Sequence, residues 1–162
     1  MDWTVFVKFA LSSAGLVFII DRASKVWIVE YLSLDTRFDI PVWPPYLNLM
    51  MAWNTGINFG LFGSGEKLGR AILIAIALAI VVGLLWWVRQ LAGWRQPLLV
   101  GAVIGGALGN VWDRVQYGAV ADFLNISCCG IHNPFAFNIA DVAIFLGAIG
   151  LILFSGKPKV KG

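Results

Sequence analysis

Residues 120–141, V-A-D-F-L-N-I-S-C-C-G-I-H-N-P-F-A-F-N-I-A-D, carry two aspartates at the borders of apolar segments. Asp122 follows one apolar segment and Asp141 lies just inside the next. An ionisable group at the mouth of a membrane span is costly unless it is paired or used. Two carboxylates that a loop brings together can activate a water molecule. We therefore interpret the rest of the chain as a membrane-embedded holder for this pair.

The composition is that of a membrane protein. Hydrophobic residues make up 59% of the 162 residues and charged residues 13%, whereas a soluble domain carries about 25% charged residues. The length allows a single domain with a few spans, because each span needs roughly 20 apolar residues. The net charge of +3 comes without a basic patch interleaved with aromatic residues, so we expect membrane lipid and no nucleic acid as a partner.

Four apolar segments predict four transmembrane helices in one domain that covers the whole chain. The predicted spans are about 5–31, 70–88, 97–114 and 138–155, with loops at about 32–69 and 115–137. In such a chain, the ends of the first and third spans lie on the same membrane side as the start of the fourth. The unusual polar residues fall at these places, which predicts one polar site at one membrane face. They are Asp21, Arg22, Lys25, Asn110, Asp113, Arg114, Asn138 and Asp141, joined by Asn54 and Asp122 from the loops.

The distribution of basic residues indicates which face carries the site, because cytoplasmic segments are enriched in lysine and arginine. Basic residues are equally numerous on the two membrane sides. On the side opposite the polar site, however, they are concentrated in the short loop Q-L-A-G-W-R-Q (90–96) and the tail K-P-K-V-K (157–161). We therefore expect both termini in the cytoplasm and the polar site at the extracytoplasmic face.

Two pairs of polar residues are spaced four apart. Asp21 and Lys25 would share a helix face and form an ion pair, which either belongs to the site or only neutralises two charges near the bilayer. Asn110 and Arg114 would project an amide and a guanidinium suited to a peptide carbonyl or a carboxylate. The alternative for Arg114 is an interfacial charge pair with its neighbour Asp113.

Gly101, Gly105 and Gly109 recur every four residues in the third apolar segment. Small residues at this spacing are typical of close contacts between membrane helices. The stripe predicts helix packing and by itself no function.

Asp122 and Asp141 would form a catalytic pair only if they lie close together. Their like charges would then prevent both from ionising readily, so that they share a proton. One carboxylate could take a proton from water while the other donates to a carbonyl oxygen. Asn138 precedes Asp141 by three residues and could share its helix face. Without a partner, each aspartate would be only a costly surface charge.

Cys128, Cys129 and His132 form a C-C-x-x-H pattern that fits zinc poorly, because adjacent cysteines do not match the usual ligand spacing. We expect a solvated loop, no metal and no cofactor. On an oxidising face the two thiols could form a strained disulfide or pair with another chain, and the sequence leaves this open.

Five blocks of sequence, in this order, resemble lipoprotein signal peptidase (signal peptidase II): D-R-A-S-K (21–25), N-T-G-I-N-F-G (54–60), G-G-A-L-G-N-V-W-D-R (105–114), V-A-D-F (120–123) and F-N-I-A-D (137–141). The resemblance covers essentially the whole chain. It implies an aspartyl endopeptidase of the bacterial inner membrane that cleaves prolipoproteins before a diacylglyceryl-modified cysteine. It also implies an all-α membrane protein of four helices, with a small extracytoplasmic β-cradle and a short extracytoplasmic helix drawn from residues 35–68.

The resemblance also implies roles for individual residues. Asp122 and Asp141 would be the catalytic pair, and Asp21, Lys25 and Asp113 would be structural or positioning residues. The expected partners are diacylglyceryl-modified prolipoproteins and membrane lipid, and the protein is expected to be a monomer. The residues expected to bind substrate are Asn54, Gly56, Asn110, Arg114 and Asn138.

Two features depart from the family pattern. Asn58 stands where the family usually has a small residue, which could alter the loop near the substrate lipid. The C-C-G-I-H loop is not a family feature, so the roles of Cys128, Cys129 and His132 stay open.

Two other classes of protein compete with a peptidase. A small proton-coupled transporter would place ionisable residues near the middle of its spans, but the second span has none inside and Asp21 is the nearest exception. A non-catalytic scaffold would need only the glycine face of the third span. It would leave Asp122, Asp141 and Asn138 without a role.

Overall fold

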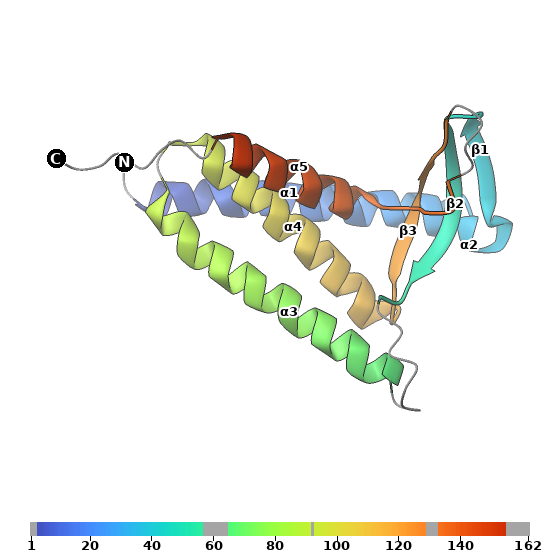
Figure 1. Ribbon diagram of the computed structural model, residues 1–162, viewed down its shortest axis with the longest axis horizontal. Coiled ribbons are helices and arrows are strands. Elements are labelled where there is room, and N and C mark those ends of the chain that lie inside the picture. Colours follow the sequence, from blue (N-terminus) through green and yellow to red (C-terminus); the bar gives the residue numbers. More distant parts are fainter. Residues whose placement is uncertain (1–2, 57–64, 92, 129–132, 155–162) are drawn as a thin grey trace.

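The computed structural model describes residues 3–56, 65–91, 93–128 and 133–154, and its helices form a bundle with a small sheet at one end (Figure 1). Each of the four apolar segments contains a helix. The helices are α1 Trp3–Lys25, continued by the π-helix η1 Val26–Tyr31, then α2 Leu34–Arg37, α3 Gly65–Trp87 with the 3-10 helix η2 Val88–Gln90, α4 Arg95–Gln116 and α5 Ile139–Phe154. The strands are β1 Asp39–Trp43, β2 Leu47–Asn54 and β3 Val120–Ile126.

Three helical segments of the described chain are long and apolar enough to cross a membrane: Trp3–Tyr31, Lys67–Gln90 and Arg95–Gln116. The fourth apolar helix, α5, is shorter at 16 residues. α1 and α5 both pack on α4, and α3 also contacts α4. The C-terminal ends of α1 and α4 and the N-terminal end of α5 all lie at the end of the bundle that carries the sheet (Figure 1).

The glycine stripe of α4 explains how closely the helices approach one another. A Cβ atom at Gly101 or Gly105 would collide with the backbone carbonyl of Ala10 or Ala14 on α1. Gly106, on the neighbouring face of α4, lies in the same way against the backbone of α5. Side chains at these positions would push the helices apart. The predicted packing role of the stripe is confirmed.

Two apolar clusters hold this arrangement together. The first fills the bundle and contains buried residues of α1, α3, η2 and α4: Ala10, Ala14, Val81, Val88, Val100 and Ile104. The second lies between the end of α1 and the sheet, and it contains Ile28, Leu34, Leu49 and Phe123. Phe123 is fully buried, so the strand residue next to Asp122 is anchored by apolar packing.

The sheet is antiparallel with the strand order β1-β2-β3. In the register of β2 and β3, Ala52 is opposite Asp122 and Asn54 is opposite Val120. Residues 35–68 were expected to contribute the sheet, and they supply β1 and β2; the third strand comes from residues 120–126. A two-stranded hairpin is marginal on its own, and the third strand completes the sheet. In the described part of residues 35–68, the helical residues are the end of the four-residue α2 and the first turn of α3.

The chain that leads into α5 runs along β3. Phe137 donates its backbone N–H to the carbonyl of Leu124 over 3.0 Å, and Leu124 donates back to Phe137 over 2.8 Å. This reciprocal bridge places the first turn of α5 beside Asp122, because Asn138 follows Phe137 directly.

Candidate active site

Asp122 lies in β3 with only 3% of its surface exposed. Its Oδ1 accepts a hydrogen bond of 2.6 Å from Nδ2 of Asn138, and its Oδ2 accepts one of 3.0 Å from Nδ2 of Asn54. Burial raises the pKa of the Asp122 carboxyl to about 6; the charge of Asp141 adds to the increase, and the two amides oppose it. A carboxyl with this pKa can hold or release a proton near neutral pH.

Asp141 lies in the first turn of α5, where it forms a reciprocal capping box with Asn138. The backbone N–H of Asp141 donates to Oδ1 of Asn138 over 2.9 Å, and the N–H of Asn138 donates to Oδ2 of Asp141 over 3.2 Å. Such a box satisfies donors that the first helical turn leaves without a partner. The three-residue spacing noted in the sequence is therefore a helix cap that also orients the carboxylate.

Asn110 of α4 connects the two carboxylates. Its Nδ2 donates to Oδ1 of Asp141 over 2.9 Å, and its Oδ1 accepts a hydrogen bond of 3.2 Å from Nδ2 of Asn138. Nδ2 of Asn138 contacts Asp122 as well. Asp122, Asn138, Asn110 and Asp141 thus form one chain of hydrogen bonds that joins β3, α4 and α5.

Arg114 lies one turn after Asn110, within the electrostatic field of Asp122 and Asp141. Its guanidinium donates to the backbone carbonyl of Asn110 over 3.3 Å. Its Nε is buried and makes no hydrogen bond within the described residues. The site therefore contains a cationic donor near the two carboxylates.

Gly56 shapes the chain directly after β2. Its backbone N–H donates to Oδ1 of Asn54 over 2.9 Å, so that the Asn54 side chain bridges this turn and Asp122. Gly56 has a φ of 83°, and a Cβ atom there would collide with Leu73 of α3. Both features favour glycine. Asn58, the departure noted in this block, lies outside the described residues.

Asp21, Lys25 and Asp113 form a buried group beneath the carboxylate pair. Nζ of Lys25 lies 2.8 Å from Oδ2 of Asp21 and 2.6 Å from Oδ2 of Asp113. The predicted ion pair between Asp21 and Lys25 is thus formed. The alternative of an Asp113–Arg114 charge pair is wrong, because the ion pairs of Asp113 in the described chain are with Lys25 and Arg22. Neighbouring residues on a helix face different directions, so Asp113 faces α1 while Arg114 lies near Asp122 and Asp141.

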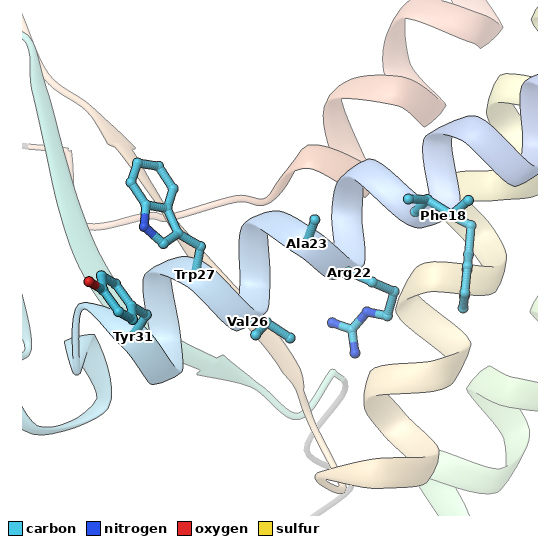
Figure 2. A pocket seen from close by; sticks show the side chains of 7 residues that line it. Phe18, Arg22, Ala23, Val26, Trp27 and Tyr31 are labelled. Atoms are coloured by element: carbon cyan, nitrogen blue, oxygen red, sulfur yellow. The ribbon is translucent and has the colours of Figure 1, made fainter.

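Arg22 and Asn125 make contacts that the sequence reasoning did not foresee. An amino nitrogen of Arg22 lies 2.6 Å from Oδ1 of Asp113, and Figure 2 shows its side chain leaving α1 toward α4. Buried Asn125 donates from Nδ2 to the carbonyls of Asn133 and Phe135 over 2.7 and 2.8 Å, which holds the chain before α5. The sequence feature that could have pointed to Arg22 is a second cation directly after Asp21. The feature that could have pointed to Asn125 is a polar residue within an apolar segment.

Two apolar grooves lie on the outer surface of the bundle. One begins at Asp141 and follows α5, lined by Phe137, Asp141, Val142, Ile144, Phe145, Leu146 and Ala148. The other follows α1 and η1 and is shown in Figure 2, lined by Phe18, Ile19, Arg22, Ala23, Val26, Trp27 and Tyr31. The first groove brings an apolar surface directly to a carboxylate of the site.

Cys128 is exposed at the end of β3, and Cys129 and His132 lie outside the described residues. No group of three or more His, Cys, Asp or Glu side chains placed to hold a metal ion occurs among residues 3–56, 65–91, 93–128 and 133–154.

The fold and the site together define a class of protein: a multi-pass helical membrane protein with a buried polar centre at one end of its bundle. Residues 13–156 match the protein family described as signal peptidase (SPase) II. The chain is 40% identical to the lipoprotein signal peptidase of Methylorubrum extorquens (strain PA1) over 86% of this chain and 80% of that protein. It is 34% identical to the lipoprotein signal peptidase of Rhodopseudomonas palustris (strain TIE-1), over 96% and 97% of the two chains.

Solved structures agree with these sequence comparisons. A structure described as a bacterial membrane enzyme, 26% identical in sequence, superposes with a TM-score of 0.75 over 91% of this chain and 94% of the other. A second one, also described as a bacterial membrane enzyme, has a TM-score of 0.70 at 25% identity. The chain belongs to the signal peptidase II family, and membership of this family implies a protease.

Proposed function

We propose that this protein is an aspartyl endopeptidase that removes the signal peptide from prolipoproteins by cleaving before a diacylglyceryl-modified cysteine. The observation that carries the proposal is the chain of hydrogen bonds that links Asp122 to Asp141 through Asn138 and Asn110. It lies where the helical bundle meets the sheet, in a chain of the signal peptidase II family. Two linked carboxylates are the equipment for water activation.

In the proposed mechanism, Asp122 holds the proton and Asp141 is the base. Burial raises the pKa of Asp122 to about 6, which supports this choice. Asp141 takes a proton from water, whose oxygen attacks the scissile carbonyl while Asp122 donates its proton to the carbonyl oxygen. When the gem-diol intermediate collapses, the C–N bond breaks, Asp141 gives its proton to the leaving amine, and Asp122 takes one proton back from a hydroxyl of the diol. The carboxylates then share one proton again.

The polar residues around the pair would hold the substrate backbone. Nε of Arg114 is buried without a hydrogen bond in the described chain, and a peptide carbonyl of the substrate would give it an acceptor. The residues proposed to contact the same part of the substrate are Asn54, Gly56, Asn110 and Asn138, and the Asn54 side chain bonds both Gly56 and Asp122.

We propose that α1, α3, α4 and α5 all span the bacterial inner membrane, with both termini in the cytoplasm and the site at the extracytoplasmic face. The 16 residues of α5 rise about 24 Å, so this helix would need part of its flanking chain to cross a core of about 30 Å. The apolar groove that begins at Asp141 supports this placement. An apolar part of the substrate could stay in lipid there while the scissile amide meets water. We propose that the protein acts as a monomer.

The test is cleavage of a diacylglyceryl-modified prolipoprotein by the purified protein in lipid bicelles. Asp122→Asn and Asp141→Asn are compared with Asp39→Asn, which changes an exposed aspartate of β1. We expect the parent and Asp39→Asn to release a product that begins with the modified cysteine. The two site variants should be folded and inactive. Cleavage by a folded Asp122→Asn or Asp141→Asn variant would refute the assignment of the carboxylate pair.

A further inference from the structure

Two buried carboxylates, Asp21 of α1 and Asp113 of α4, contact the backbone directly beside both proposed catalytic residues. Oδ2 of Asp113 accepts a hydrogen bond of 3.2 Å from the backbone N–H of Ala121, and Oδ1 of Asp21 accepts one of 3.1 Å from the N–H of Ala140. Ala121 immediately precedes Asp122, and Ala140 immediately precedes Asp141. Each carboxylate of the buried group therefore accepts a hydrogen bond from the backbone N–H of the residue directly before one of the proposed catalytic aspartates.

Lys25 joins these two contacts. Its Nζ lies 2.6 Å from Asp113 and 2.8 Å from Asp21, and only 2% of its surface is exposed. We propose that Lys25 is a positioning residue, which sets the separation of Asp122 and Asp141 by holding Asp113 and Asp21 on one ammonium group. This inference rests on the proposed function, because it takes those two aspartates as the reacting groups.

The two peptide groups depend on these acceptors because both are buried. Ala121 is 1% exposed and Ala140 is 0% exposed. The N–H of Ala140 belongs to the first turn of α5, where helical backbone donors have no partner within the helix. Asp21 supplies that partner from α1, and Asp113 supplies one to β3 from α4. β3 and α5 are thus both linked, through these carboxylates, to the same buried cation.

Energetics favour a geometric role over a purely stabilising one. Buried ion pairs often add little net stability, because the desolvation of the charges offsets their attraction. Apolar side chains could fill the same volume, but they could not accept hydrogen bonds from Ala121 and Ala140. A displacement of about 1 Å at reacting groups can reduce the rate by about 100-fold. A rigid link between the two peptides would prevent such displacements.

Gly109 offers a way to disturb this link without changing any charge. A Cβ atom at Gly109 would lie 2.6 Å from Oδ2 of Asp21, the oxygen that pairs with Lys25. The Gly109→Ala variant should therefore displace Asp21 and, through Ala140, the start of α5. It keeps Asp21, Lys25, Asp113 and both catalytic aspartates.

The test compares three variants in the cleavage assay described above. The double variant Asp21→Asn/Lys25→Met removes one charge of each sign and keeps an acceptor oxygen for Ala140. It should lower kcat by about 10- to 100-fold while KM stays unchanged. Gly109→Ala should lower kcat in the same way, and Lys25→Arg should retain most of the parent kcat because a guanidinium can still bridge two carboxylates.

The matched control is Ser13→Ala, at the other end of the α1–α4 contact. It removes the 2.8 Å hydrogen bond from Oγ of Ser13 to the carbonyl of Leu98, and it should leave kcat unchanged. Thermal unfolding verifies that each variant is folded. Folded Asp21→Asn/Lys25→Met and Gly109→Ala proteins with the parent kcat would overturn the positioning role, as would a change confined to KM. If only Asp122→Asn and Asp141→Asn are inactive, the proposed function stands and this inference fails. If those two variants are active, the proposed function itself fails.

Discussion

Removal of the Asn54 amide should extend activity to higher pH. Nδ2 of Asn54 donates to Oδ2 of Asp122 over 3.0 Å, and this bond favours the ionised carboxylate and lowers its pKa. In the proposed mechanism Asp122 must carry a proton, so the rate falls as pH rises through its pKa of about 6. Asn54→Ala raises this pKa. The alkaline limb of the pH profile should therefore move upward.

The expected size of the shift follows from the strength of one hydrogen bond. A bond to a charged group contributes about 1.5–3 kcal/mol, and one pKa unit corresponds to about 1.4 kcal/mol. The full effect would be roughly one to two pKa units. Asn54 is exposed at the end of β2, so water can replace its amide in part. We expect a shift of about 0.5–1 unit, from about 6 toward 7.

The assay is kcat/KM for a lipid-modified peptide between about pH 5 and about pH 9, because the pH dependence of this ratio reports ionisations of the free enzyme. Asn48→Ala is the matched control, since Asn48 lies in the same strand opposite Asn125 and away from Asp122. A uniform loss of rate with an unmoved limb would show that Asn54 acts on substrate alone. A limb that moves to lower pH would refute the reasoning, because it would reverse the sign of the hydrogen bond's effect.

Two further predictions concern packing and capping. Gly101→Val should lower the free energy of unfolding by about 1–3 kcal/mol, because its side chain would collide with Ala10 of α1. The control Gly83→Ala should be neutral or stabilising, because nothing lies within 4 Å of the added Cβ. Denaturation in detergent compares the two variants. Asn138→Ser should keep the helix cap but remove the amide that contacts Asp122 and Asn110, so kcat should fall while the unfolding midpoint changes little. Asn138→Ala should lower both, and a Ser variant as active as the parent would show that the amide is dispensable.

The helices of this protein could be predicted from sequence because long apolar runs leave few alternatives. The location of the polar residues at one end of the bundle followed from counting the spans. Residues 54 and 138 were singled out for their chemistry, but the helix cap at Asn138 was not foreseen. A capping residue is recognised only once the helix start is known, and the sequence placed that start one residue too early.

The pairing of Asp113 with Lys25 and Arg22 could not be predicted, for a different physical reason. Asp113 and Arg114 are adjacent in sequence, and which of them faces α1 depends on the rotation of α4 about its axis. That rotation is set by the glycines against Ala10 and Ala14. The third strand was missed because β3 is buried almost throughout, and it therefore lacks the alternation that marks a half-exposed strand.

The glycine stripe also shows that packing and the site depend on the same contact. Gly101 and Gly105 meet backbone carbonyls of α1, but the next glycine of the stripe, Gly109, meets the carboxylate of Asp21. Four residues of helix rise about 6 Å, so the close approach of α1 and α4 continues to the level where Lys25 reaches Asp113. A looser contact would separate Lys25 from one of its two carboxylates and leave a charge buried without its partner. The small residues of α4 therefore allow a buried cation to connect two helices, and through them the strand and the helix that carry Asp122 and Asp141.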